Sequence, residues 1–467
     1  MLGRRSPFPG ALGVRDSTRK SGDRRFPGLV RLTPMRTTTA LLALALLTVG
    51  CGGAAGGGVG APPNVSVAPT VHATGAVSAE RIASLRARGE AGVAELAAEV
   101  DREVDPGRRA ELEDALDQVA QQRDAAASRL YWHTDLEAAK RAAKATGRPI
   151  LSLRLLGKLT DELSCANSRF FRVALYPNAD VRRALAGFVL HWSSERPAPR
   201  ITIDFGDGRV VTRTITGNSI HYALDEEGRP LDAMPGLVGP AAFARWLGDA
   251  SSLAQRARAG ARADVLRAHH QASVAGLAAR YRTEAALIGV PGEPPFVAAP
   301  TPPVPGKPAA PTAMTVAPSK AMVEAPPLRR FAPSAPPPAI DRVPWALFAA
   351  LPAHAADARL DAAGRAMIAK KSPRDWSDPK SPRPLDAAGI ASLTAAFERS
   401  MAEDTAKNTL GLHPSIHAWL AEDPSLGFDA LNALVYRSLF LTPADDPWLG
   451  LVPAGAFSAI ADDGISP

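Results

Sequence analysis

The chain has 467 residues, of which 46% are hydrophobic and 22% charged, so it is long enough for two or three domains. Its formal net charge of +7 favours a nucleic acid or an anionic membrane as partner only if the excess lies in the folded part. It does not, because residues 1–36 hold nine basic and two acidic side chains. The remainder keeps 45 of the 54 basic and 45 of the 47 acidic residues, which argues against nucleic acid as a partner.

A secretory leader is predicted at residues 35–50. Arg36 precedes an apolar run that is too short for an ordinary membrane span and that ends in small residues before Cys51. The ending LTVGC resembles the lipobox of bacterial lipoproteins, although Thr48 stands where that family usually has leucine. The resemblance implies that Cys51 carries the lipid. Cleavage by an ordinary signal peptidase and an uncleaved anchor remain open.

The residues on either side of the leader fit this interpretation. Residues 1–34 read as an extension upstream of a true start at Met35, or as a long basic leader region. Residues 51–78 are rich in Gly, Ala and Pro, which is typical of a flexible tether. We therefore expect a lipid-anchored protein of a bacterial cell envelope, which faces the periplasm or the exterior and has envelope proteins as partners.

A helical hairpin is predicted over residues 79–130. Apolar side chains recur at helical spacing in 79–104 and again in 108–130. The tripeptide DPG at 105–107 separates the two helices, because Pro and Gly end a helix and turn the chain. Such a hairpin can pack against the next domain or mediate self-association, and we favour packing.

Helices and strands alternate over residues 131–250, which predicts an α/β sandwich around a central sheet. A helix that ends at Gly147 leads into the apolar strand PILSLRLL, and a second helical pattern follows in SCANSRFFRVAL. A short helix and a strand, a β-hairpin about a Gly-Asp-Gly turn, a further strand and a closing helix complete the domain.

The rest of the chain is predicted to be mainly helical. Residues 251–285 read as a helical extension, and residues 286–338 as a semi-stiff Pro-rich linker. Within the linker, the segment SKAMVEAPPLRR has the pattern of a helical turn that docks elsewhere. Residues 341–460 form a second, mainly helical module, in which the sequence indicates no complete set of catalytic residues.

Residues 132–247 resemble the thioredoxin-like domains of bacterial envelope proteins. The resemblance rests on DLEAAKRAAKATGRPILSLRL as first helix and strand, on CANS at 165–168 in the place of the redox motif, and on the closing strand, turn and helix in HYALDEEGRPLDAMPGLVGPAAFARWL. It implies a nucleophilic thiol at Cys165. A cysteine in the first turn of a helix feels the positive end of the helix dipole, which favours the thiolate, and Arg169 follows on the same helix face.

The motif departs from that family in three places. Ser168 replaces the second cysteine, Ser164 stands where the family usually has tryptophan, and residues 216–222 lack the family's cis-proline. We therefore predict that the degenerate thioredoxin-like domain serves as a protein-interaction platform. The alternative is a monothiol protein for thiol–disulfide exchange or redox sensing, with Cys165 as nucleophile and Ser168 and Arg169 beside it. Neither function calls for a cofactor.

Four histidines invite a metal interpretation. His413 and His417 are four residues apart, which places them on one face of a helix and makes half of a zinc site. The sequence offers no third ligand near them, and His269 and His270 are neighbours that face apart on a helix. We therefore expect no metal. His191 and His221 fall on predicted strands, where packing and hydrogen bonding are favoured over catalysis.

Overall fold

The computed structural model describes residues 76–215, 218–295, 317, 319, 339–378, 380–442 and 459–460. These residues belong to one compact unit that runs from Val71 to Pro467. The predicted leader, Cys51 and most of the Pro-rich linker lie outside the described residues. Within the described part of the chain, no helix is long and apolar enough to cross a membrane.

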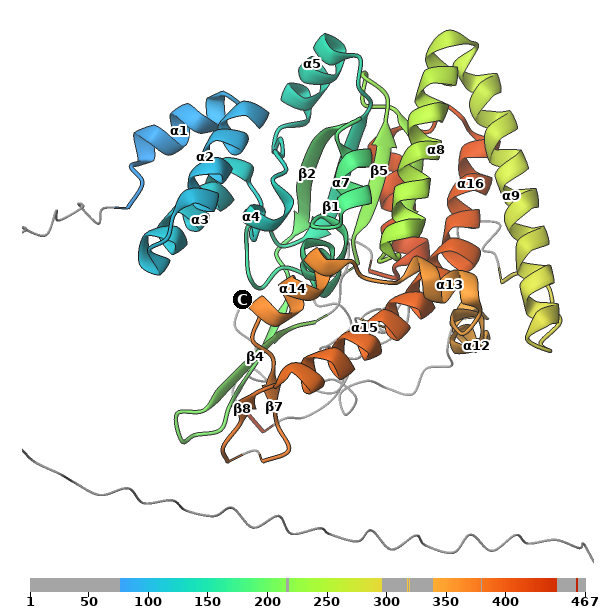
Figure 1. The fold of residues 1–467 in the computed structure, drawn as a ribbon. Coiled ribbons are helices and arrows are strands. Elements are labelled where there is room, and N and C mark those ends of the chain that lie inside the picture. Colours follow the sequence, from blue (N-terminus) through green and yellow to red (C-terminus); the bar gives the residue numbers. More distant parts are fainter. Residues whose placement is uncertain are drawn as a thin grey trace, which may run out of the picture. The chain divides into compact units, whose positions relative to one another are not determined.

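The fold is mixed α/β, which confirms the class predicted from the alternation of elements. Its centre is a four-stranded sheet with the order β2-β1-β5-β6 (Figure 1). The strands are β1 (Ile150–Leu156), β2 (Val189–Arg196), β5 (Ile220–Leu224) and β6 (Pro230–Pro235). β1 runs parallel to β2 and antiparallel to β5, and β5 pairs antiparallel with β6. Every residue of β5 and β6 is buried, so the sheet is covered on both faces there.

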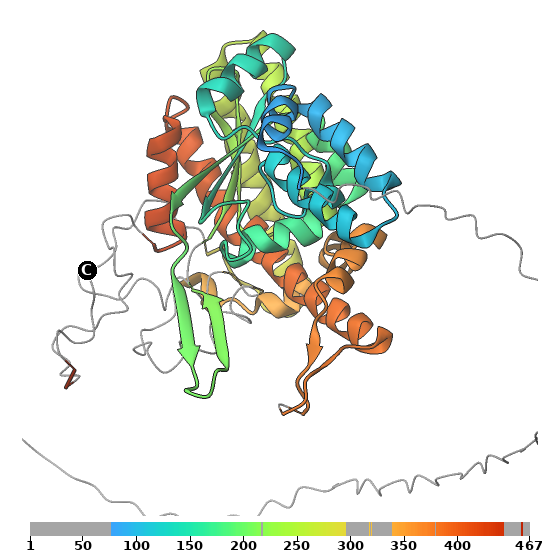
Figure 2. The ribbon, with the colours of Figure 1, turned by 90° about the vertical axis from the view of Figure 1, so that its left-hand side faces the viewer.

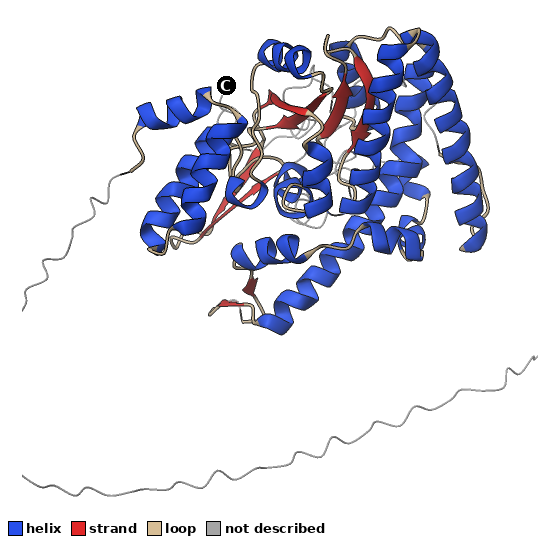
Figure 3. Cartoon of the chain, turned by 45° about the horizontal axis from the view of Figure 1, so that its top comes forward, coloured by secondary structure: helices blue, strands red, loops and turns tan. Residues whose placement is uncertain are grey.

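Helices precede, connect and follow the strands. The helix α5 (Leu136–Thr146) is capped by Asp135 and ends at Gly147, whose φ of 69° suits glycine. Between β1 and β2 lie α6 (Ala166–Phe170), the π-helix η1 (Phe171–Leu175) and α7 (Ala179–Leu185). After β6 come α8 (Pro240–Ala259) and the long α9 (Arg262–Leu287). Figure 3 shows the central strands with helices packed around them.

The N-terminal helices form a small cluster with its own apolar core. They are α1 (Ala79–Ala87), α2 (Glu90–Arg102), α3 (Pro106–Ala120) and α4 (Ala125–Ser128). The segment 79–104, expected as one helix, is two helices, because the chain turns at Gly89 with a φ of 64°. The cluster packs on the sheet domain, as favoured from the sequence: Trp192 Nε1 donates to the Gln121 carbonyl over 2.8 Å.

The apolar side chains of the helices that follow the linker belong to the same hydrophobic core as those of the sheet. They are α12 (Trp345–Ala349), α13 (Pro352–Asp357), α14 (Ala362–Lys370), α15 (Ala387–Lys407), η3 (Asn408–Leu412), α16 (His413–Glu422), α17 (Phe428–Leu434) and η4 (Val435–Leu439). In β5, His221 contacts Phe243 of α8, whereas Tyr222 contacts Phe428 of α17. Successive side chains of a strand point to opposite faces, so α8 and α17 cover opposite faces of the sheet.

Two β-hairpins project from the body of the molecule (Figure 2). The larger joins β3 (Arg200–Asp204) to β4 (Val210–Thr214) about the predicted Gly-Asp-Gly turn. The φ angles of Gly206 and Gly208 are 75° and 88°, values that favour glycine. The smaller hairpin joins β7 (Arg374–Asp375) to β8 (Arg383–Pro384).

Candidate metal centre

The cysteine singled out by the sequence lies in the core. Cys165 is the N-cap residue of α6 and its side chain is completely buried. Its Sγ lies 2.8 Å from Ser219 Oγ and 3.5 Å from Ser168 Oγ, so two of the three predicted site residues meet. Arg169 turns elsewhere, since its Nη1 donates to the Ser164 carbonyl and to Thr214 Oγ1 over 3.1 Å each.

The two histidines predicted on strands, His191 and His221, are hydrogen-bonded core residues. His191 Nδ1 lies 2.8 Å from Ser152 Oγ, and His221 Nε2 lies 2.9 Å from Tyr176 Oη. Burial lowers the pKa of His191 to about 4 and that of His221 to about 3. Both are therefore uncharged at neutral pH and serve packing.

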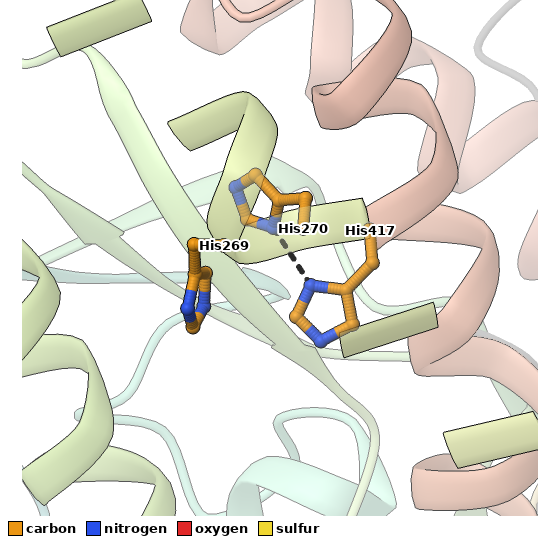
Figure 4. A group of neighbouring side chains, drawn as sticks. All are labelled: His269, His270 and His417. Carbon is orange, nitrogen blue, oxygen red and sulfur yellow. Dashed lines mark hydrogen bonds between the residues drawn. The ribbon is translucent and has the colours of Figure 1, made fainter. Parts of the chain in front are cut away.

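A second group of titratable side chains gathers where β6, α9 and α16 meet. It consists of one carboxylate and four imidazoles: Asp232, His269, His270, His413 and His417. Asp232 Oδ1 lies 3.0 Å from His413 Nε2 and 3.6 Å from His417 Nδ1. His417 Nδ1 also lies 2.8 Å from His270 Nδ1, and Figure 4 shows this contact with His269 beside it.

The carboxylate of Asp232 is held by its neighbours. Trp246 Nε1 on α8 donates to Asp232 Oδ2 over 2.8 Å, which fixes the plane of the carboxylate. Oδ1 then faces the histidines of α16, with the Ala233 N–H 2.8 Å away. A buried carboxylate needs such partners, because an uncompensated charge in the core is costly.

The two α16 histidines share one face because they are four residues apart, as the sequence predicts. The π-helix η3 leads directly into α16, and Pro414 occupies the first turn. A π-helical turn shifts the residues that follow relative to an α-helical register, and such turns are frequent at functional sites. The ring centroids of His413 and His417 lie 4.0 Å apart.

The protonation states of the cluster suit metal binding. Burial alone raises the pKa of Asp232, but the neighbouring His413 and its hydrogen bond outweigh burial and hold that pKa well below its usual range. Burial lowers the pKa of His270 to about 4 and that of His417 well below its usual value. Asp232 is thus ionised and these two imidazoles are neutral at pH 7, which are the forms that ligate metals.

Two overlapping ligand sets are present, and both contain His417. One consists of Asp232, His413 and His417, all buried, and the other of His269, His270 and His417. In each set the ligand atoms lie within 4.8 Å of one another. Bonds of about 2.0–2.2 Å to a tetrahedral ion separate ligand atoms by roughly 3.3 Å, close to the 3.0 and 3.6 Å around Asp232 Oδ1.

The sequence identified half of this site. The absence of metal was expected because His413 and His417 had no third ligand nearby, and the structure brings Asp232 to them from 181 residues away. The signal that could have found it is an ionisable residue inside the short apolar strand PLDAMP. A buried aspartate of this kind needs partners, and the histidine pairs of α9 and α16 are the natural ones.

Comparison with known proteins does not indicate a function, so the function is inferred from the chemistry of the site. No family model matches the sequence, and no curated protein or solved structure is significantly similar to it.

Proposed function

We propose that the protein binds one divalent transition-metal ion through Asp232, His413 and His417. The observation that carries the proposal is the convergence of these three buried ligands, with Asp232 Oδ1 3.0 Å and 3.6 Å from the two imidazole nitrogens. Two imidazoles and one carboxylate form a donor set that suits zinc, iron and neighbouring first-row metals.

The set that contains Asp232 is favoured over the set that contains His269 and His270. A dication in the core needs a negative ligand, because neutral imidazoles leave its charge uncompensated. Asp232 supplies that charge, and the Trp246 hydrogen bond to Oδ2 orients the ligating oxygen as second-layer partners do in metal sites. His417 Nδ1 also lies 2.8 Å from His270 Nδ1, so binding of the ion requires the lone pair of this nitrogen to turn from His270 to the ion.

Metal titration of the full chain tests this proposal. After treatment with a chelator, calorimetry with Zn²⁺ and Co²⁺ should give one ion per chain. Asp232→Asn keeps the shape of the side chain but removes its charge, and we expect it to abolish the high-affinity event. The matched control is His191→Gln, which alters a buried, hydrogen-bonded histidine outside the cluster. Equal binding by the Asp232→Asn variant and by the unmodified chain would refute the site.

We also propose that residues 131–250 have a thioredoxin-like architecture. The parallel pair β1–β2 with its connecting helices, the antiparallel β5–β6 hairpin and the closing α8 support it. So does the contact of Cys165 Sγ with Ser219, from the segment that the resemblance assigns to the loop before the last strands. Burial of Cys165 favours a structural role over thiol exchange.

The platform function and the envelope location stay predictions. The lipid anchor at Cys51 lies outside the described residues, and so do the leader and the tether.

A further inference from the structure

The metal ligands border a pocket on one side. Asp232, His413 and His417 line a cavity of about 360 Å³ that runs between α8, α9 and η3. This volume can hold several water molecules or a small anion beside an ion, since one water molecule occupies roughly 30 Å³. Structural metal sites enclose their ion with four protein ligands, whereas three ligands beside an open space are typical of sites that exchange a ligand.

The charge of the pocket depends on the ion. Among its lining residues are three carboxylates and two guanidiniums: Asp232, Asp249, Asp357, Arg245 and Arg280. Arg280 is also paired with Glu284 over 2.7 Å, so with neutral histidines the formal charge of this group is −2, and a bound dication changes it to 0. The empty pocket therefore repels an anion, and the bound ion removes that repulsion.

An unused hydrogen-bond donor stands next to the ligands. Thr409 lines the same pocket, and its Oγ1 is buried without a hydrogen-bond partner among the described residues. Thr409 lies in η3, four residues before His413. Buried hydroxyls are normally satisfied, so this one points to a missing acceptor at the site.

We infer that the ion bound by Asp232, His413 and His417 keeps an exchangeable coordination position that faces the pocket and takes a small oxyanion, a phosphate or a carboxylate. The inference rests on the metal binding proposed above. The oxyanion contributes one oxygen to the ion, and another of its oxygens accepts the hydrogen bond that Thr409 Oγ1 lacks. No bond is formed or broken in the ligand.

Cobalt spectroscopy on the full chain tests the inference. The visible absorption of Co²⁺ changes with its coordination, so titration of the loaded protein with inorganic phosphate, and separately with acetate, should give a saturable spectral change in at least one series. A response to phosphate alone or to acetate alone assigns the class of oxyanion. Thr409→Val should weaken that response by roughly three- to tenfold and leave Co²⁺ affinity unchanged.

Thr394→Val is the matched control, because the Thr394 hydroxyl donates to the Ile390 carbonyl of its own helix over 2.8 Å, and Thr394 does not line the pocket. It should respond like the unmodified chain. One Co²⁺ per chain with a spectrum that neither anion changes would overturn the exchangeable position and leave metal binding intact. Absence of bound Co²⁺ would overturn both proposals.

Discussion

Trp246 Nε1 donates a 2.8 Å hydrogen bond to Asp232 Oδ2, and the other carboxylate oxygen, Oδ1, lies 3.0 Å from His413 Nε2. The indole thus sets the direction in which the carboxylate presents Oδ1 to the histidines of α16. Hydrogen bonds that orient a metal ligand in this way usually contribute 10- to 100-fold to metal affinity.

Trp246→Phe should therefore weaken Zn²⁺ binding by roughly 10- to 100-fold while the ring still fills its place in the core. The measurement is calorimetric titration of the chelator-treated chain. Trp192→Phe is the control, because the Trp192 indole donates to the Gln121 carbonyl, away from the cluster. If both variants bind Zn²⁺ as tightly as the unmodified chain, the indole does not orient the ligand.

Asp404 makes stability depend on pH. Burial raises its pKa from 3.8 to about 7, although Ser319 N–H donates to Oδ2 over 3.0 Å and Lys407 is nearby. The folded chain thus retains a proton that the unfolded chain releases above about pH 4, so this group lowers stability as pH rises from 4 to 7. Asp404→Asn removes the effect.

We expect Asp404→Asn to exceed the unmodified chain in free energy of unfolding by on the order of 2–4 kcal/mol at pH 8, and to match it near pH 4. Urea unfolding at both pH values measures the difference. Asp114→Asn is the control, because Asp114 is exposed on α3. A difference that stays constant from pH 4 to pH 8 contradicts a raised pKa at Asp404.

Gly239, the N-cap residue of α8, packs closely against the backbone at the end of α13. A Cβ at Gly239 would lie 2.1 Å from the Asp357 carbonyl oxygen, a backbone atom that has little room to move. Gly239→Ala should lower the free energy of unfolding by about 3 kcal/mol or more. Gly248→Ala, on the same helix with open space around it, should instead raise it by roughly 0.5–1 kcal/mol. Equal effects at both sites would argue against this packing.

Cys165 should resist alkylation in the native chain. Its side chain is completely buried and contacts Ser219, so the reagent reaches the sulfur only after local or global opening. Mass spectrometry of the peptide that contains Cys165 should show modification on the order of a hundredfold slower in buffer than in urea. An alkylation rate in buffer close to the rate in urea would favour the monothiol alternative.

The sequence predicted elements that depend on local patterns. The helix that ends at Gly147, the strand at 150–156 and the β-hairpin about Gly206 and Gly208 all carry their own turn or cap residues. The break at Gly89 was not predicted, because the apolar spacing continues through it. The shared core of the sheet and the C-terminal helices depends on complementary surfaces more than 100 residues apart, which one sequence does not display.

The candidate metal site was likewise predicted only in its local part. His413 and His417 were recognised as a possible half-site because helical spacing is local. Asp232 and His270 approach His413 and His417 only because β6 and α9 pack against α16. The spacing of residues along the chain does not indicate this contact. The predicted approach of Arg169 to the sulfur used spacing alone, whereas the side chain finds better acceptors in the Ser164 carbonyl and the Thr214 hydroxyl.

Anomalous diffraction from crystals of the Co²⁺-loaded full chain tests the central claim most directly. The account predicts one strong peak at about 2.0–2.2 Å from Asp232 Oδ1, His413 Nε2 and His417 Nδ1. A crystal saturated with Co²⁺ that shows no peak at these three side chains would contradict it.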